Sequence, residues 1–304
     1  MREGPAIVAT PGAVVQRRQL RTELKKARAK SRLTQQEVAA RMDWSPSKLI
    51  RIEAGQVGVT TNDLRALLET YGIVEPDQVD HFLELARASR KLPYGEYRGL
   101  ISKTYMDLLS YEYSASIVRT YESLVIPGML QTEEYARAVN MAYSPEITGE
   151  RLDRLIELRL QRQELLEAPQ RPELFFVLDE ASIRRCIGSP GIMVAQLNRL
   201  KTLANLPGVC IQVIPFKAGA HRGMRGAFSH MEFEAELDDI VYLERYPGSQ
   251  VTDEPEVTGQ HLEVFWELEA LAPPTDLPQL IDRAIEEMSD PVESPASTTD
   301  ITES

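Results

Sequence analysis

The sequence predicts two domains of different class: an all-α N-terminal domain, and an α+β C-terminal domain with a small sheet and several helices. From residue 17 to 91, apolar residues recur at helical spacing between residues that typically start and stop helices. From residue 100 to 288, helical segments alternate with short segments of β-branched and aromatic residues. With 304 residues, the chain is long enough to bury a full core in its larger part.

Changes in composition place the expected boundaries. We expect a disordered leader at residues 1–16, the helical domain at 17–92 and the α+β domain at 93–288, with Pro93-Tyr94-Gly95 marking the division. Residues 289–304 are acidic, rich in Pro, Ser and Thr, and contain no basic residue. This composition predicts a disordered acidic tail.

The composition also argues against several kinds of protein. No run of about eighteen apolar residues is present, and the N-terminus lacks the apolar core of a signal peptide. We therefore expect a cytoplasmic protein with no membrane contact. Cys186 and Cys210 are expected to be buried free thiols, because disulfides are rare in the cytoplasm. The four histidines, without CxxC or HExxH spacing, predict no metal, and nothing indicates a cofactor.

Local signals define the first two helices. The first is predicted by apolar residues at helical spacing: Leu20, Leu24 and Ala27. Thr34 is followed three residues later by Glu37, which is the spacing of a capping box. A second helix is therefore predicted to begin at Gln35.

A short turn and a third helix follow. Asp43 and Trp44 form the turn, Ser45 is placed to cap the third helix, and Pro46 suits its first position, where no N–H is needed. Gly55 ends that helix. Two more helices are expected at 62–71 and 76–91. A helix, a short turn and a helix at this spacing form the helix-turn-helix unit, whose second helix enters the major groove of DNA by its N-terminal end.

The charge of this segment agrees with DNA as the partner. From Arg17 to Arg51 there are eleven basic and three acidic residues, in a chain whose net charge is −12. A basic block in an acidic protein indicates binding to a polyanion. The basic residues are Arg17, Arg18, Arg21, Lys25, Lys26, Arg28, Lys30, Arg32, Arg41, Lys48 and Arg51.

The residues of this segment resemble the Xre/phage-repressor family of helix-turn-helix regulators. The matching runs are Leu33-Thr34-Gln35-Gln36-Glu37-Val38-Ala39 and Ser45-Pro46-Ser47-Lys48-Leu49-Ile50-Arg51-Ile52-Glu53-Ala54-Gly55. The resemblance implies a lambda-repressor-like all-α domain. It also implies that Gln35 contacts a DNA phosphate, and that Arg28 pairs with Glu53 to lock the first helix to the third.

The predicted DNA-contacting residues are Arg28, Thr34, Gln35, Gln36, Ser45, Ser47, Lys48 and Arg51. Ser47, Lys48 and Arg51 lie three and four positions apart and should share the outward face of the third helix. Arg51 could contact a base, a phosphate or neither. Trp44 is expected to pack at the turn rather than to stack on a base.

The second half of the chain predicts a mixture of helices and strands. Helices are expected at 105–121, 132–143, 149–167, 192–205, 256–271 and 276–288, with a further short helix capped near Asp179. Strands are expected at 173–178, 209–214, 227–233 and 239–244.

This half resembles the C-terminal domain that actinobacterial Xre regulators carry under the name DUF5753, an antitoxin-like group. The resemblance rests on the runs Tyr105-Met106-Asp107-Leu108-Leu109, Val125-Ile126-Pro127-Gly128-Met129-Leu130-Gln131-Thr132, Phe176-Val177-Leu178-Asp179-Glu180 and Pro215-Phe216 with Gly219-Ala220-His221. Many such regulators are encoded beside a small DUF397-type protein. The resemblance therefore implies that protein as a partner.

Polar residues near the ends of the predicted elements form a candidate ligand site: Tyr121, Glu122, His221 and Arg222. The glycines around His221 could cradle an anion or a small ligand, or could be only structural. No nucleophile elbow, phosphate loop or ligand cluster is present, so we predict no catalytic residue and no enzyme.

Three functions therefore compete. The first is a sequence-specific transcriptional regulator whose C-terminal domain forms a homodimer, on an inverted repeat of duplex DNA, and receives a signal from a small-molecule effector or a protein. The second is an antitoxin-like member of a two-gene module, in which the DUF397-type partner tunes DNA binding. The third is an enzyme fused to a DNA-binding module. Turnover of a nucleotide or an ester would favour the third.

Overall fold

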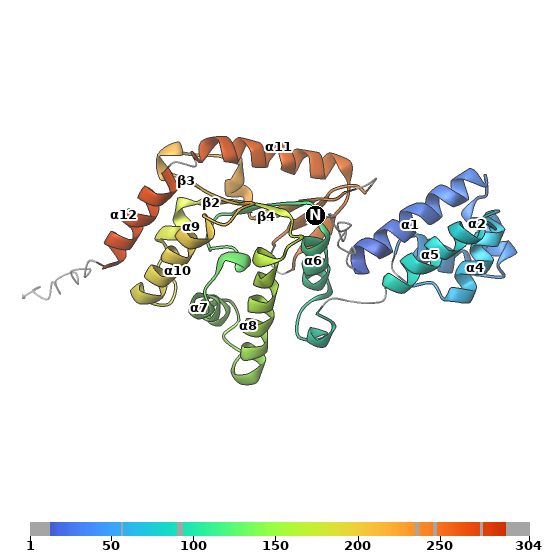
Figure 1. The fold of residues 1–304 in the computed structure, drawn as a ribbon, viewed down its shortest axis with the longest axis horizontal. Coiled ribbons are helices and arrows are strands. Elements are labelled where there is room, and N and C mark those ends of the chain that lie inside the picture. The colour runs from blue at the N-terminus through green and yellow to red at the C-terminus, as the bar shows by residue number, and fades with distance from the viewer. Residues whose placement is uncertain are drawn as a thin grey trace, which may run out of the picture. The chain divides into compact units, whose positions relative to one another are not determined.

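The computed structural model describes residues 13–55, 57–89, 94–234, 237–245, 248–273 and 276–289 (Figure 1). Predictions for residues 1–12, for Pro93 and for 290–304 fall outside these ranges. Contacts divide the chain into two compact units. Unit 1 comprises residues 1–118, 164–173 and 229–261, and unit 2 comprises 119–163, 174–228 and 262–304. The contacts therefore do not divide the chain at residue 93.

Unit 1 begins with five helices, as the all-α prediction requires. They are α1 (Ala13–Lys30), α2 (Gln35–Arg41), α3 (Pro46–Glu53), α4 (Thr61–Thr70) and α5 (Pro76–Ala88). Residues 13–16, which we expected in the disordered leader, form the first turn of α1 and are buried. The leader prediction is wrong there, because these apolar side chains find a packing surface that local composition does not reveal.

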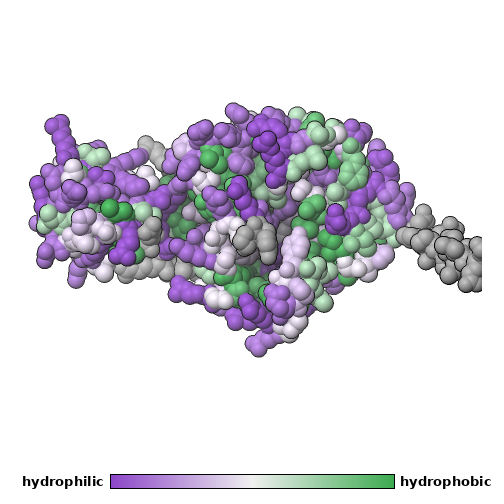
Figure 2. Space-filling view, turned by 180° about the vertical axis from the view of Figure 1, so that it is seen from behind, coloured by the Kyte–Doolittle hydropathy of each residue, from purple (hydrophilic) through white to green (hydrophobic). Residues whose placement is uncertain are grey.

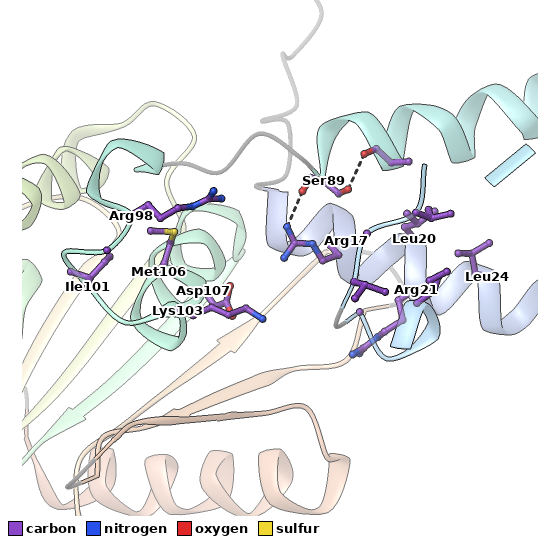
Figure 3. A pocket seen from close by; sticks show the side chains of 17 residues that line it. Arg17, Leu20, Arg21, Leu24, Ser89, Arg98, Ile101, Lys103, Met106 and Asp107 are labelled. Carbon is purple, nitrogen blue, oxygen red and sulfur yellow. Dashed lines mark hydrogen bonds between the residues drawn. The ribbon is translucent and has the colours of Figure 1, made fainter. Parts of the chain in front are cut away.

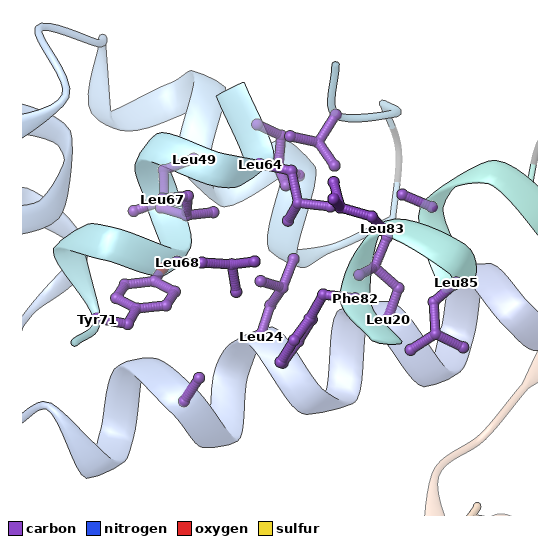
Figure 4. Packing of buried hydrophobic residues seen from close by; sticks show 14 of the residues in the cluster. Leu20, Leu24, Leu49, Leu64, Leu67, Leu68, Tyr71, Phe82, Leu83 and Leu85 are labelled. Carbon is purple, nitrogen blue, oxygen red and sulfur yellow. The ribbon is translucent and has the colours of Figure 1, made fainter. Parts of the chain in front are cut away.

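Figure 4 shows how the five helices share one core. Leucines from α1, α3, α4 and α5 converge, and Tyr71 and Phe82 close the cluster. Leu49, Leu64, Leu67 and Leu68 are completely buried. Burying one such side chain contributes roughly 1.5–3 kcal/mol, so this cluster is the main source of stability for the helices that carry the predicted DNA contacts.

The elements after α5 differ from the prediction at Ile117–Glu122 and at one additional short strand. Helix α6 runs over Lys103–Ser114 and ends there, and Ile117–Glu122 is strand β1. We predicted one helix through residue 121. The prediction was wrong because β-branched and aromatic residues in 117–121 suit an extended strand. Strand β1 is paired within a sheet, which a local pattern cannot show. Strands β4 (Phe228–Glu232), β5 (Ile240–Leu243) and the unpredicted short β6 (Gln250–Thr252) follow.

Unit 2 contains the remaining helices and strands. The helices are α7 (Glu133–Tyr143), α8 (Gly149–Gln163), α9 (Glu180–Arg184), α10 (Pro190–Leu203), α11 (Pro255–Leu271), which starts in unit 1, and α12 (Leu277–Ser289). The strands are β2 (Glu173–Asp179) and β3 (Val209–Ile214). Figure 1 shows α11 along one face of β2 and β3, with α9 and α10 on the other.

The six strands form one sheet in the order β3-β2-β1-β4-β5-β6, which confirms the predicted α+β class. Strands β2 and β3 are parallel, in a register that runs from Leu174 opposite Val209 to Asp179 opposite Ile214. The carboxyl ends of these two strands therefore lie at the same edge of the sheet. Strand β2 leads directly into α9, and β3 leads into a short 3-10 helix at Phe216–Ala218. Ligands of open α/β sheets bind at such edges.

The cysteines are free thiols, as predicted, but they are not both buried. Cys186 is exposed and Cys210 is partly buried. Cys186 lies two residues after the end of the short helix α9. Cys210 lies on β3, where burial raises the pKa of its thiol.

Candidate nucleic-acid interface

Helices α2 and α3 and the turn between them form the predicted helix-turn-helix unit. Thr34 and Glu37 make the capping box at the start of α2, and Ser45 caps α3 by accepting a hydrogen bond from the backbone N–H of Lys48 at 3.3 Å. Asp43 adopts a left-handed backbone conformation with φ of 53°, which turns the chain sharply between the helices. Thr34 and Ser45 are exposed. The caps therefore place two helix N-termini, with their free N–H groups, at the surface.

The buried carboxylate of Glu53 joins three helices. Arg28 on α1 donates from Nε to Glu53 Oε1 at 2.6 Å and from Nη2 to Oε2 at 3.1 Å. Gln35 on α2 donates from Nε2 to the same Oε2 at 2.7 Å. Arg28 also donates to the carbonyl oxygen of Leu33 at 3.1 Å. The hydrogen bond that Arg28 donates to Glu53 raises the pKa of the Arg28 guanidinium, which therefore stays charged.

Arg28 and Gln35 both contact Glu53 within the protein, so their role in this geometry is structural. Arg28 has 21 % of its side chain exposed, and Glu53 has 1 %. The expected Arg28–Glu53 pair is present in the structure, and Gln35 joins it. A DNA phosphate would have to share the Gln35 amide with Glu53.

Lys48 is held by two neighbours on its outward side. Its Nζ lies 3.2 Å from Asp63 Oδ2 and 3.8 Å from the centre of the Trp44 ring. Trp44 itself is partly buried and packs against the core, as expected. Asp63 belongs to α4, fifteen residues further along the chain, and the sequence contains no local signal for this contact. Lys48 is therefore oriented before any ligand binds.

The remaining predicted contacts lie on an open surface. Gln36, Ser47 and Arg51 are all exposed, and Arg51 Nε approaches the Ser47 carbonyl oxygen at 3.4 Å. Ile50, between them on α3, is 47 % exposed. Helix α3 thus presents polar, cationic and apolar groups outward, which are the groups that contact base edges and thymine methyls.

Only part of the basic block is available to a polyanion. Arg18 and Arg21 on α1 approach Asp253, at 3.4 Å and 2.7 Å, and Arg18 also pairs with Asp238. The Arg17 side chain donates to the carbonyl oxygen of Ser89. With Arg28 and Lys48 also paired, the exposed cations are Lys25, Lys26, Lys30, Arg32, Arg41 and Arg51. Figure 2 shows a mostly hydrophilic surface over the N-terminal helices on the visible face.

The candidate ligand residues in the second half are partly brought together. The rings of Tyr121 and His221 meet edge to face, with centres 6.2 Å apart. His221 Nε2 lies 3.1 Å from Asp179 Oδ2, at the end of β2. Within the described residues, Tyr121 Oη and His221 Nδ1 are buried without a hydrogen-bond partner. Burial and the nearby charge of Asp179 raise the pKa of Tyr121, which keeps its hydroxyl protonated.

The other two candidate residues lie apart from this pair. Arg222 is exposed and donates to Glu267 on α11 at 2.8 Å. Glu122 follows Tyr121 in β1, and successive side chains of a strand point to opposite faces. The polar group that the geometry assembles is therefore Tyr121, His221 and Asp179. Asp179, like Tyr121 and His221, is a polar residue near the end of a predicted element, but it was not among the predicted ligand residues. It lies 42 residues from His221, so no motif links the two.

The helix pair and its capped termini define a helix-turn-helix DNA-binding domain. A family model described as a helix-turn-helix domain matches residues 19–82. A second model, described as a domain of unknown function (DUF5753), matches residues 105–277, which is more than half of the chain. The protein therefore belongs to the DUF5753 family.

The two matches confirm the resemblance stated for each half of the sequence. Assignment to the Xre group and to actinobacteria stays a prediction. No curated protein matches the chain, and no solved structure matches it. Among the helices in the described ranges, none combines the length and the apolar character needed to cross a bilayer.

Proposed function

We propose that this protein is a sequence-specific transcriptional regulator, rather than an enzyme, that binds duplex DNA through α3. One observation carries the proposal: α3 has an open outward face with Ser47, Ile50 and Arg51, while its inner end is anchored by buried Glu53. A helix that is rigidly held and open on one face suits docking in a major groove.

The proposal gives the predicted residues distinct roles. Ser47, Lys48 and Arg51 contact base edges, and Gln36 and the capped N-terminus of α2 contact the phosphate backbone. Thr34 and Ser45 act by capping α2 and α3, which fixes where these two helices begin. Arg28 and Gln35 act indirectly, because their hydrogen bonds to Glu53 set the position of α3.

We also propose that the regulator works as a homodimer on an inverted repeat. One helix-turn-helix covers a few base pairs, so selecting one promoter in a genome requires two modules about one helical turn apart. Exposed apolar side chains in unit 2 support a self-complementary face: Phe216, Met224 and Trp266 are each more than half exposed. A small DUF397-type protein on the same face is the alternative occupant. Light scattering of the protein alone distinguishes a homodimer from a monomer that needs this partner.

The Tyr121–His221–Asp179 group supports a role for unit 2 in receiving a signal. Two buried polar atoms without partners, within the described residues, can accept hydrogen bonds from a small molecule. We expect such a regulator to act in the cytoplasm, where its DNA lies.

DNA binding can be tested with the protein's own upstream region. Gel shifts should show specific binding by the full chain, and Arg51→Ala should weaken binding by about tenfold or more while relaxing base preference. Arg87→Ala removes an exposed arginine from α5 and is the matched control. Equal binding to the upstream region and to random DNA would refute the proposal.

A further inference from the structure

Unit 1 contains a cavity beside the DNA-binding helices. Its volume is about 630 Å³, which lies within the usual range of about 300–1,000 Å³ for small-molecule sites. Figure 3 shows that α1 and the chain around α3 supply one side, while residues of the 98–107 segment supply the other. All lining residues belong to unit 1.

The cavity has an apolar floor that is continuous with the helix-turn-helix core. Leu20, Leu24 and Ile52 line it and are also members of the core cluster. Ile101 and Met106 supply apolar surface from the opposite side. A ligand here would therefore need an apolar body.

Cationic groups surround this floor. Arg17, Arg21, Arg98 and Lys103 line the cavity with Asp107 as the only carboxylate among the described lining residues. Figure 3 shows the Arg98 and Lys103 side chains extending toward the side that carries Arg17.

Two of the four cations, Arg98 and Lys103, can still pair with an anion. Arg17 already donates a hydrogen bond to the Ser89 carbonyl oxygen, and Arg21 donates one to Asp253. Arg98 and Lys103 are exposed, and within the described ranges their side chains form no hydrogen bond or ion pair. Burial raises the pKa of Asp107, although the charges of Lys103 and Arg17 oppose that rise. Asp107, the only carboxylate among the described lining residues, is therefore a weaker acid than an ordinary aspartate.

We infer that this cavity is an effector site for an amphipathic organic anion, whose apolar body lies on the leucine floor and whose acid group meets Arg98 and Lys103. An aliphatic chain or ring system with one carboxylate or sulfonate has this chemistry. A neutral or cationic analogue leaves the cationic rim unpaired, so it binds less tightly.

The position of the cavity couples it to DNA binding. Ile52 and Gly55, which line it, lie at the end of α3 and directly after it. Ile52 precedes Glu53, which anchors α3 to Arg28 and Gln35. A ligand that contacts Ile52 therefore favours one position of α3 over another, and differential binding of this kind is the basis of allosteric control. This regulatory step rests on the proposed DNA-binding function, whereas the ligand site does not.

The ligand site can be tested without DNA. Calorimetry of the full chain with dodecanoate and with 8-anilinonaphthalene-1-sulfonate should show saturable binding with one site per chain. Dodecylammonium, at equal concentration, should bind at least about tenfold more weakly, as expected when a charge-assisted contact is lost. No saturable binding of either anion, or equal binding of the ammonium, would overturn the ligand site.

Variants locate the binding to the cavity. Arg98→Gln and Lys103→Gln should each raise the Kd of the anion about tenfold, and both residues are exposed, so folding is preserved. Arg151→Gln, at an exposed position of α8 outside the cavity, is the matched control. If all three variants bind alike, the anion occupies another surface.

A separate measurement tests the coupling. The anion should change the affinity of the wild-type protein for its upstream DNA by about fivefold or more, which is the usual scale of allosteric coupling. Arg98→Gln should abolish the change at the same anion concentration. Anion binding with unaltered DNA affinity would overturn the regulatory step alone, and absent DNA binding would refute the proposed function but not the ligand site.

Discussion

Arg28 and Glu53 form a two-point ion pair across the first and third helices, with the nearest nitrogen and oxygen 2.6 Å apart. The carboxylate is 1 % exposed, and Gln35 donates to the same group. Because an unpaired buried carboxylate is costly, the three helices are held together by one charge. The orientation of α3 toward DNA depends on this pair although neither residue needs to contact a base.

Removing either member of the pair should destabilise the helical domain. Arg28→Ala and Glu53→Ala should each lower the free energy of unfolding by about 3–5 kcal/mol in urea melts, because each leaves a charge without its partner. The double variant should lose less than the sum of the two. Arg87→Ala, at an exposed position of α5, is the control and should change little. Additive losses would show that the two side chains are not coupled.

Neutralising Asp63 should strengthen DNA binding. Asp63 holds Lys48 at 3.2 Å and places a negative charge close to the reading face of α3. Asp63→Asn frees the Lys48 ammonium and removes repulsion from phosphate, so the Kd for DNA should fall a few-fold at low salt. Glu69→Gln, at an exposed acidic position of the same helix, is the control. A weaker Asp63→Asn complex would mean that Asp63 orients Lys48 for binding.

DNA affinity should fall steeply with salt. If the exposed cations of the helical segment other than Arg51 contact phosphates, affinity should decrease by roughly several hundredfold between roughly 50 and 200 mM salt. Lys25→Gln and Lys30→Gln should each lower the logarithmic salt slope by about one. Arg283→Gln, at an exposed position of α12, should leave the slope unchanged. A slope near zero would exclude phosphate contacts as the source of affinity.

Acid should weaken the contacts of Asp253. Burial opposes the ionisation of this carboxyl, but the hydrogen bond from Arg21 and the charges of Arg18 and Arg21 outweigh it and lower the pKa of Asp253 below 3.8. The stabilisation is therefore present above about pH 4 and is lost as the pH falls through the lowered pKa. Asp253→Asn should lower Tm at pH 6 and have a smaller effect at pH 3. An equal effect at both would contradict the ion pair.

Gly223 should not tolerate a side chain. A Cβ there would lie 2.5 Å from the Tyr121 ring, which is fully buried and packed against His221. Gly223→Ala should therefore lower the free energy of unfolding by about 1–3 kcal/mol, as for other overpacked positions. Gly259→Ala, on α11 with open space around the new atom, is the control and should be neutral or stabilising. Equal melting temperatures of the two variants would show that the Gly223 segment moves away from Tyr121 without cost.

The sequence by itself determined the helix-turn-helix, because its signals act over a few residues. The capping box of Thr34 and Glu37, the Ser45 cap and the glycine stop each specify a backbone turn locally, and the structure contains all of them. The family resemblance supplied the Arg28–Glu53 pair. The family matches confirm both halves, while the roles of individual DNA-contacting residues stay predictions.

Only the tertiary structure decided which charges remain available and which segments become strands. Arg18 lies 235 positions from Asp253, and Lys48 lies fifteen positions from Asp63. No local sequence pattern predicts contacts over such separations. The apolar residues of Ile117–Glu122 are spaced in a way that fits either a helix or a strand. The segment forms strand β1 because it pairs with its neighbours in the sheet. Long-range pairing and burial are properties of the folded chain, and a stretch of sequence cannot encode them alone.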